Sequence, residues 1–281
     1  MSDPTPTAAL PVDQQVRYEL TDAGVAWITL DRPDVANAIS PAQRDRVIEL
    51  LDDAARLLAV RCVVLTATGR AFCTGADLRA ERTPDPRPEG APEQPVGYVS
   101  RMIATGAQAL IGAVLDCPKP VLAAVNGTAA GIGAHLAFAC DLVVAADSAR
   151  FIEVFVRRGL VPDGGGAYLL PRLIGLQRAK ELLFLGDDVS ADDARALGLV
   201  NRVVPAAEVT AEAGALADRL AAGPTQALAL TKMLCNRSLD SDRATAFHEE
   251  AWAQEANMGT HDAQEGVRSF VERRTAAYRG W

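Results

Sequence analysis

The stretch Val121–Gly166 decides the fold, and it reads VLAAVNGTAAGIGAHLAFACDLVVAADSARFIEVFVRRGLVPDGGG. VLAAV is typical of a buried strand, Asn126-Gly127 ends it, and a helix of small residues is expected to begin at Gly131. The first N–H groups of a helix have no partner inside the helix, and the positive end of its dipole lies there. The turn at Gly131 therefore suits an oxyanion, although its glycines could equally serve only close packing of strand and helix.

A second glycine-rich turn lies upstream, in RCVVLTATGRAFCTGADL (61–78). Val63–Ala67 predicts another buried strand, and Thr74-Gly75-Ala76-Asp77 is expected to lead into a helix after a short loop. Two turns that each offer a free N–H can hold one oxygen atom from two sides.

The rest of the chain predicts an α/β fold followed by helices. Val16–Leu30 predicts two strands around a turn at 21–24, and Ser40-Pro41 is typical of the start of a helix. Thr83–Pro95 contains five prolines and predicts an irregular, exposed loop. Beyond Pro205, four segments show the one-sided apolar pattern of helices.

Composition excludes several function classes. The 281 residues are 49% hydrophobic and 23% charged, as in soluble globular proteins, and no uninterrupted apolar run predicts a membrane span. The net charge of −8 argues against non-specific nucleic-acid binding. The five cysteines are scattered without a CxxC pair, which indicates reduced thiols and no metal site. The first 15 residues lack the features of a signal peptide, so we expect a flexible leader and a cytoplasmic protein.

Six segments resemble the crotonase family, the enoyl-CoA hydratases and isomerases. They are LDRPDVANAIS (30–40), AFCTGADL (71–78), PKPVLAAVNGTAAGIGAHLAFACDLVVAADSARF (118–151), GLVPDGGGAYLLPRLIG (159–175), ARALGLVNRVVP (194–205) and EGVRSFVERR (265–274). The resemblance implies a spiral of ββα turns over residues 16–205 and a helical region at 206–281 that assembles a homotrimer or a dimer of trimers. It also implies an acyl-CoA thioester substrate, with coenzyme A as part of the substrate and no separate cofactor.

The same resemblance assigns binding roles to individual residues. The backbone N–H groups of Ala76 and Ile132 would hold the thioester oxygen. Coenzyme A would lie along a set of residues that includes Ala76 and a helix at the end of the chain, from this or a neighbouring subunit: Arg32, Ala36, Phe72, Leu78, Phe270 and Arg273. Each of these could instead be an ordinary surface or core residue.

The acid and base positions depart from the hydratase pattern. Hydratases of this family hold a water between two glutamates, and this chain has His135 and Phe155 at those positions. Phe155 cannot transfer a proton, and we expect Glu153 to face away from the position of Phe155. Asp163 falls where dienoyl-CoA isomerases, ring-epoxide isomerases and chlorobenzoyl-CoA dehalogenases of the family carry a catalytic aspartate.

One carboxylate is enough to move a proton between two carbons of one substrate. The sequence therefore predicts an acyl-CoA isomerase with Asp163 as the base, although Pro-Asp-Gly is also a common turn. His135 is either a wall residue or a partner of the substrate or of Asp163. The alternatives are an enoyl-CoA hydratase that uses His135, or an acyl-CoA binder without catalytic activity.

Overall fold

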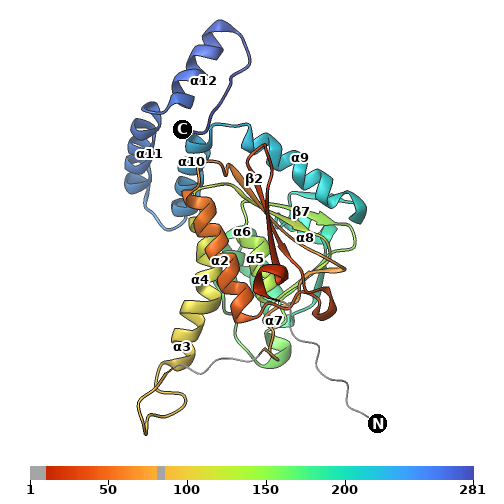
Figure 1. Cartoon of the computed structure of the whole chain (residues 1–281). Helices are drawn as coiled ribbons and strands as arrows, with labels where there is room; N and C mark the ends of the chain where they lie inside the picture. Colours follow the sequence, from red (N-terminus) through yellow and green to blue (C-terminus); the bar gives the residue numbers. More distant parts are fainter. Residues whose placement is uncertain (1–10, 81–85) are drawn as a thin grey trace.

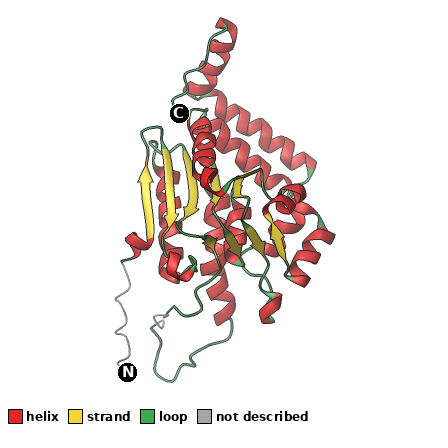
Figure 2. Cartoon of the chain, turned by 90° about the vertical axis from the view of Figure 1, so that its right-hand side faces the viewer, coloured by secondary structure: helices red, strands yellow, loops and turns green. Residues whose placement is uncertain are grey.

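The computed structural model describes residues 11–80 and 86–281, and two sheets lie between its helices (Figures 1 and 2). The larger sheet has the order β1-β2-β3-β5-β7-β10, in which only β1 is antiparallel to its neighbour. Its strands are Val16–Leu20 (β1), Val25–Leu30 (β2), Cys62–Ala67 (β3), Val121–Val125 (β5), Leu142–Ala146 (β7) and Arg202–Val204 (β10).

The smaller sheet has the order β4-β6-β8-β9. Its strands are Ala71–Cys73 (β4), Thr128–Ala130 (β6), Arg150–Ile152 (β8) and Asp188–Ser190 (β9). Three consecutive strand pairs, β3/β4, β5/β6 and β7/β8, each give their first strand to the larger sheet and their second to the smaller sheet. Helical segments follow each pair, which is the predicted repetition of ββα turns.

Helices cover both sheets. The longer ones are Pro41–Arg56 (α2), Tyr98–Ile103 (α3), Ala109–Asp116 (α4), Ile132–Ala139 (α5), Gly166–Ile174 (α6), Leu176–Leu185 (α7), Ala191–Leu197 (α8), Val209–Ala221 (α9), Thr225–Ser238 (α10), Arg243–Met258 (α11) and His261–Glu272 (α12). Short helical turns occupy Val12–Gln15 (α1), Pro33–Val35 (η1), Ala104–Gln108 (η2), Val156–Arg158 (η3) and Ala206–Glu208 (η4). Most of the predicted leader, residues 1–10, lies outside the described residues.

The predicted start of α2 is confirmed by a complete capping box. The Ser40 hydroxyl accepts a hydrogen bond from the N–H of Gln43 at 3.3 Å, and the Ser40 N–H donates to Oε1 of Gln43 at 3.0 Å. Pro41 occupies the first helical position, where its missing N–H costs nothing. The hairpin β1/β2 and the buried strands β3 and β5 also lie where the sequence predicts them.

One predicted helix is wrong. Thr74-Gly75-Ala76-Asp77 leads into a turn at 78–80, not into a helix. The Asp77 carboxylate accepts a hydrogen bond from the N–H of Arg79 at 3.0 Å, and this local bond favours a turn over a helix. The expected loop over Thr83–Pro95 has neither helix nor strand at 86–95, and residues 81–85 lie outside the described part.

Residues Tyr98–Asp116 form a continuous helical segment, α3-η2-α4. By length and composition this segment could cross a membrane, and the prediction of no membrane span overlooked it because it considered the run that Asn126, His135 and Asp141 interrupt. Buried side chains at Leu110 and Val114 pack α4 onto the body of the protein beside α2 and α5. Core helices of soluble proteins pass the same test of length and composition.

The helices after β10 divide into two groups. The first, α9, lies on β2, β3, β5 and β7 and buries Val209, Ala213 and Ala217, so it belongs to the core. In the second group, α10 packs on the body through the buried Lys232, which bonds the carbonyl of Val114, whereas α11 and α12 extend away from the sheets (Figure 1). The predicted division at residue 206 therefore places one core helix in the terminal region.

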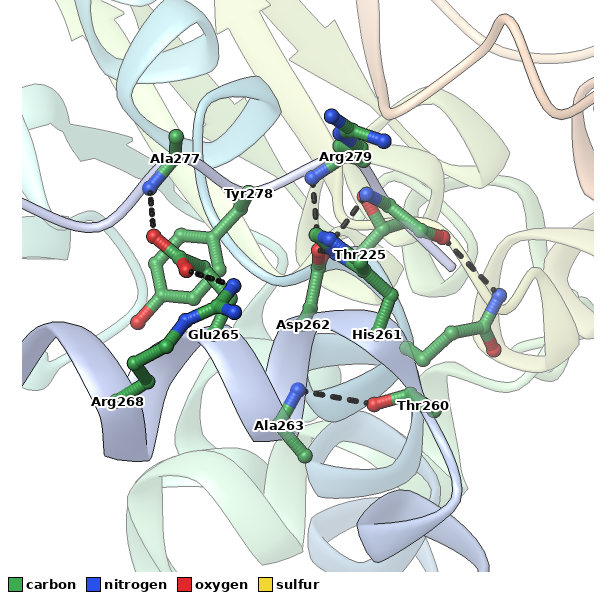
Figure 3. A network of polar contacts seen from close by, with 12 residues as sticks. Thr225, Thr260, His261, Asp262, Ala263, Glu265, Arg268, Ala277, Tyr278 and Arg279 are labelled. Carbon is green, nitrogen blue, oxygen red and sulfur yellow. Dashed lines mark hydrogen bonds and ion pairs between the residues drawn. The ribbon is translucent and has the colours of Figure 1, made fainter.

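The last residues run back along α12 and are held there by two buried carboxylates (Figure 3). Asp262 accepts hydrogen bonds from the N–H groups of Arg279 and Gly280, both at 2.7 Å. Glu265 accepts one from the N–H of Ala277 at 3.0 Å. The chain end is thus fixed to the helix that precedes it.

Candidate active site

The two glycine-rich turns lie side by side because the strands that precede them are neighbours. β4 and β6 pair in parallel, with Cys73 opposite Ala129. The turns begin at the same edge of the smaller sheet, and a Cβ at Gly75 would lie 3.4 Å from the carbonyl oxygen of Ala130. The turns that carry Ala76 and Ile132 are therefore next to each other, as predicted.

Ala76 is held in an isolated parallel bridge with Ile39. The N–H of Ile39 donates to the carbonyl of Gly75 at 2.8 Å, and the N–H of Asp77 donates to the carbonyl of Ile39 at 2.9 Å. Successive N–H groups of an extended chain point to opposite sides, so the N–H of Ala76 points away from Ile39. Within residues 11–80 and 86–281 this N–H donates to no other group.

Ile132 is the first residue of α5. Gly131 before it has a φ of 53°, and its carbonyl accepts hydrogen bonds from Ala134 and His135. The N–H of Ile132 precedes the first intrahelical bond, and no acceptor for it lies in the part of the chain that the structure describes. Because only the main chain at this position offers a hydrogen bond, a side chain in place of glycine leaves the donor intact.

Ala76, Ile132 and Asp163 line one cleft of about 550 Å³. The other lining residues come from the turn after β4, from residues before and in the start of α2, and from the helical segment α3-η2: Asp77, Ile39, Ser40, Pro41, Ala42, Arg44, Asp45, Tyr98, Met102, Ile103 and Ala107. The cleft therefore combines an apolar wall with two free backbone N–H groups and carboxylates.

Asp163 differs from the other two carboxylates of this cleft. Asp45 pairs with Arg44 at 2.7 Å and Asp77 pairs with Arg32 at 3.0 Å, whereas Asp163 has no ion-pair partner among the described residues. Burial raises the pKa of the Asp163 carboxyl above its ordinary value, and the nearby His135 partly offsets that rise. A half-buried carboxyl with a raised pKa is a suitable proton acceptor and donor.

His135 lies behind the cleft wall, with none of its surface exposed. Its Nε2 atom is 2.9 Å from Oε2 of Glu153, and its ring stacks on Phe155 with centroids 5.3 Å apart and an interplanar angle of 12°. The expectation that Glu153 faces away from the position of Phe155 is therefore wrong. Strand β8 ends at Ile152 and the chain turns at 154–155, where Phe155 has a helical backbone, so both side chains contact the same imidazole.

The His135–Glu153 pair leaves two polar atoms without partners. His135 Nδ1 and Glu153 Oε1 are buried and make no hydrogen bond to any described residue. A buried polar atom without a partner typically costs about 1–3 kcal/mol. Such a cost on two neighbouring groups beside a cleft is common at functional sites.

Four of the residues assigned to coenzyme A lie close together around the turn at Ala76, which is the one of the four that lines the cleft. Arg32 donates to the carbonyl of Ala38 at 3.2 Å and pairs with Asp77, which lies between Ala76 and the exposed Leu78. Ala36 has a left-handed backbone, and its carbonyl accepts a hydrogen bond from the Thr74 hydroxyl at 3.0 Å. Arg32, Ala36, Ala76 and Leu78 are thus brought together.

The other three assigned residues lie elsewhere. The Phe72 side chain is completely buried in the core, so its ring cannot stack on a ligand. Phe270 lies on α12 and Arg273 directly follows it. In Figure 1, α12 and α3 lie at opposite ends of the molecule. Phe270 is 84% exposed, and neither residue lines the cleft of its own chain.

Sequence reasoning missed the wall that α3-η2 contributes. Tyr98, Met102 and Ala107 line the cleft, but the sequence analysis assigned no helix between the proline-rich loop and Val121. Gly97, with a φ of 80°, directly precedes the helix, and the apolar run that follows was a usable signal for it. The partner of His135 was also missed, because Glu153 was expected to face away from the position of Phe155.

A family model described as enoyl-CoA hydratase/isomerase matches residues 20–280. The chain belongs to the enoyl-CoA hydratase/isomerase family. A protein of this family from Rhodobacter capsulatus, named "Probable enoyl-CoA hydratase", is 38% identical over 94% of this chain and 98% of its own. The 1,2-epoxyphenylacetyl-CoA isomerase of Escherichia coli is 36% identical over 92% of this chain and 96% of its own.

Solved structures of the family have the same fold. The enoyl-CoA hydratase of Bacillus anthracis superposes with a TM-score of 0.85 at 33% identity, over 95% of this chain and 100% of that one. The predicted crotonase-like α/β architecture is therefore confirmed. Relatives in the family carry both hydratase and isomerase names, so the family alone does not decide between these reactions.

Proposed function

We propose that this chain is an acyl-CoA isomerase that moves a double bond, or rearranges the acyl group, with Asp163 as its base. The observation that carries the proposal is the position of Asp163. It is a carboxylate without an ion-pair partner among the described residues, in the cleft that also holds the free N–H groups of Ala76 and Ile132. The E. coli relative named 1,2-epoxyphenylacetyl-CoA isomerase supports it.

The reaction follows from these three groups. Removal of a proton from the carbon next to the thioester carbonyl, or next to a double bond conjugated with that carbonyl, places negative charge on the carbonyl oxygen. Two N–H donors of this type each contribute about 3–4 kcal/mol to the stability of that charge in the transition state. Asp163 takes the proton from one carbon and returns it to another, so the electron pair shifts along the chain and no water is added. A carboxylate whose pKa is raised is a stronger base than an ordinary aspartate, which favours the step in which Asp163 takes the proton.

In the proposed complex, the coenzyme A portion of the substrate lies along Arg32, Ala36 and Leu78, and the acyl portion lies in the cleft. We propose that Phe270 and Arg273 complete this binding site from a neighbouring copy in a homotrimer. The exposure of Phe270, remote from its own cleft, supports this arrangement. Light scattering would give three times the chain mass, and Phe270→Ala would weaken coenzyme A binding. A monomer that binds coenzyme A normally would contradict the shared site.

A hydratase is the competing function, and the His135–Glu153 pair favours it. The pair supplies an imidazole and a carboxylate at 2.9 Å, and the R. capsulatus relative carries a hydratase name. Against it, His135 has no exposed surface, so water addition would require an opening of the wall. A binder without activity would bind acyl-CoA and convert none.

The decisive experiment follows a panel of 2-enoyl-CoA and 3-enoyl-CoA thioesters by mass spectrometry. An isomerase changes double-bond position without a change in mass, whereas a hydratase adds the mass of water. Asp163→Asn should lower the isomerase rate by about 10²–10⁴-fold and leave acyl-CoA binding unchanged. The control Asp188→Asn breaks an exposed ion pair with Arg157 and should keep full activity. Full isomerase turnover in Asp163→Asn, or hydration alone, would overturn the proposal.

A further inference from the structure

The starting observation is that the His135 imidazole is held on three sides. Glu153 bonds its Nε2 atom, Phe155 stacks on its face, and Gly166 lies against its edge. A Cβ at residue 166 would be 2.2 Å from Nε2 and 2.5 Å from Cε1, so no side chain fits there. A ring fixed in this way has one orientation.

The contact with Gly166 places this ring against the turn that carries the proposed base. Gly166 begins α6, and its N–H donates a hydrogen bond to the carbonyl of Asp163 at 3.4 Å. The imidazole therefore packs on the short turn between Asp163 and α6. His135 Nδ1 and Glu153 Oε1 have no partner among the described residues, which leaves each group able to share a further proton or hydrogen bond.

His135 is left as the counterion of Asp163, because its charge acts on the Asp163 carboxyl and the cations at the cleft and its edge are already paired. From α2, Arg44 faces the cleft but is paired with Asp45, and the Asp77 carboxylate is paired with Arg32. From α3, Tyr98 contributes a phenol, and from the far side Glu153 bonds His135. A protonated imidazole beside a carboxylate favours the ionised carboxylate, and a second carboxylate on the imidazole favours its protonation.

We propose that His135 and Glu153 form a positioning pair for Asp163: Glu153 orients and charges the imidazole, and the imidazolium keeps the half-buried Asp163 carboxylate ionised and ready to accept a proton. The catalytic value of the pair rests on the proposed function. The coupling of the three side chains does not, and it can be measured without any substrate.

The first experiment is a titration of the Asp163 carboxyl by ¹³C NMR in the ligand-free protein. The signal is assigned from its absence in Asp163→Asn. His135→Gln removes the imidazole and should raise the pKa of Asp163 by about one unit, which is the lower end of the effect of a neighbouring opposite charge. The control is Asp188→Asn, which breaks an exposed ion pair on β9, the strand that pairs with β8. It should leave the pKa of Asp163 unchanged.

Glu153→Gln is the sharper variant, because its sign separates two explanations. Loss of the Glu153 charge alone would lower the pKa of Asp163, since one negative neighbour is gone. Loss of the imidazole charge that Glu153 maintains would raise it. An upward shift like that of His135→Gln supports the pair. A downward shift, or no shift, overturns it.

A second readout covers the case in which His135→Gln does not fold. The chain has three histidines, and His135 is the buried one, so its ring nitrogens can be followed by ¹⁵N NMR in the protein and in Glu153→Gln. The pair predicts an imidazolium in the parent at pH 7 and a neutral ring in the variant. The same ring state in both would overturn the proposal.

Activity, where present, gives a third readout. Both variants should shift the acid limb of the kcat/KM profile to higher pH, by the same number of pH units as the measured change in the pKa of Asp163. The rate should be restored at higher pH. A purely structural pair would lower the rate at every pH. If no acyl-CoA is isomerised, the proposed function fails, whereas the two NMR titrations still decide whether the three side chains are coupled.

Discussion

Gly133 lies directly against the backbone of Cys73. A Cβ at residue 133 would be 2.1 Å from the Cys73 carbonyl oxygen and 2.7 Å from its carbonyl carbon. Helix α5 and strand β4 therefore touch backbone to backbone. Since Ile132 precedes this contact and Ala76 follows Cys73 by three residues, the contact sets the separation of the two free N–H groups.

Gly133→Ala should destabilise the protein by about 3 kcal/mol, because the added methyl must push two backbones apart. Urea denaturation followed by circular dichroism measures this change. The matched control is Gly112→Ala in α4, where a Cβ would come no closer than 3.9 Å to another group and alanine suits a helix better than glycine. Equal stability of the two variants would contradict the role given to Gly133.

Asp163→Asn should make the protein more stable at pH 7. Burial raises the folded-state pKa of this carboxyl above its ordinary value of 3.8, so its ionisation opposes folding. The stabilising effect of the neutral carboxyl is complete below the ordinary value and is lost as pH rises through the folded-state pKa. Denaturant midpoints of the parent and the variant should therefore separate above that pKa and converge in acid. A less stable variant at pH 7 would show that Asp163 supports the fold instead.

Glu265→Gln should release the chain end from α12. Hydrogen bonds from Arg274, Ala277 and Arg268 hold the pKa of Glu265 well below its ordinary value of 4.5. A carboxyl whose pKa is lowered in the folded state stabilises the fold at pH values above its ordinary pKa. This stabilisation is lost as pH falls from the ordinary pKa through the folded-state pKa. Hydrogen exchange at Ala277 should be faster in Glu265→Gln at pH 7, and the difference from the parent should shrink in acid. Unchanged exchange would mean that Asp262 alone holds the tail.

Lys232→Met should destabilise the protein by about 2 kcal/mol, because it removes a buried ammonium that pairs with the partly exposed carboxylate of Asp141 and donates hydrogen bonds to backbone carbonyls. Lys232 Nζ lies 2.8 Å from Asp141 Oδ2 and 2.9 Å from the Val114 carbonyl, with 7% of its side chain exposed. Arg56→Met at the exposed pair with Asp53 is the control and should cost less than about 1 kcal/mol. Chemical denaturation compares them, and a loss below 1 kcal/mol for Lys232→Met would refute the prediction.

The sequence predicted those parts of the site that depend on local chemistry. Ser40-Pro41 starts a helix because the serine hydroxyl and the proline ring suit the first turn wherever the helix lies. Gly131 and Gly75 mark turns because their positive φ values exclude most side chains. These features predicted two glycine-rich turns able to hold one oxygen atom, whereas the family and the choice of Ala76 and Ile132 came from the resemblance of six segments.

Contacts between residues that are far apart in the sequence could not be predicted from these local rules. The family resemblance assigned Phe72 to the coenzyme A site, whereas in the structure its ring is buried in the core. Tyr98 reaches the cleft only because α4 packs on α2 and α5 and carries the preceding turns of helix beside Asp163.

The sequence by itself determined the glycine turns, the start of α2 and the buried strands β3 and β5, since these follow from propensity and backbone sterics within a few residues. Tertiary structure alone decided that Glu153 reaches His135, that Gly166 leaves room for the ring, and that Asp163 has no ion-pair partner among the described residues. The reason is physical: hydrogen bonding, burial and charge pairing depend on which surfaces meet, and residues 18 and 31 positions apart meet only when the fold is complete.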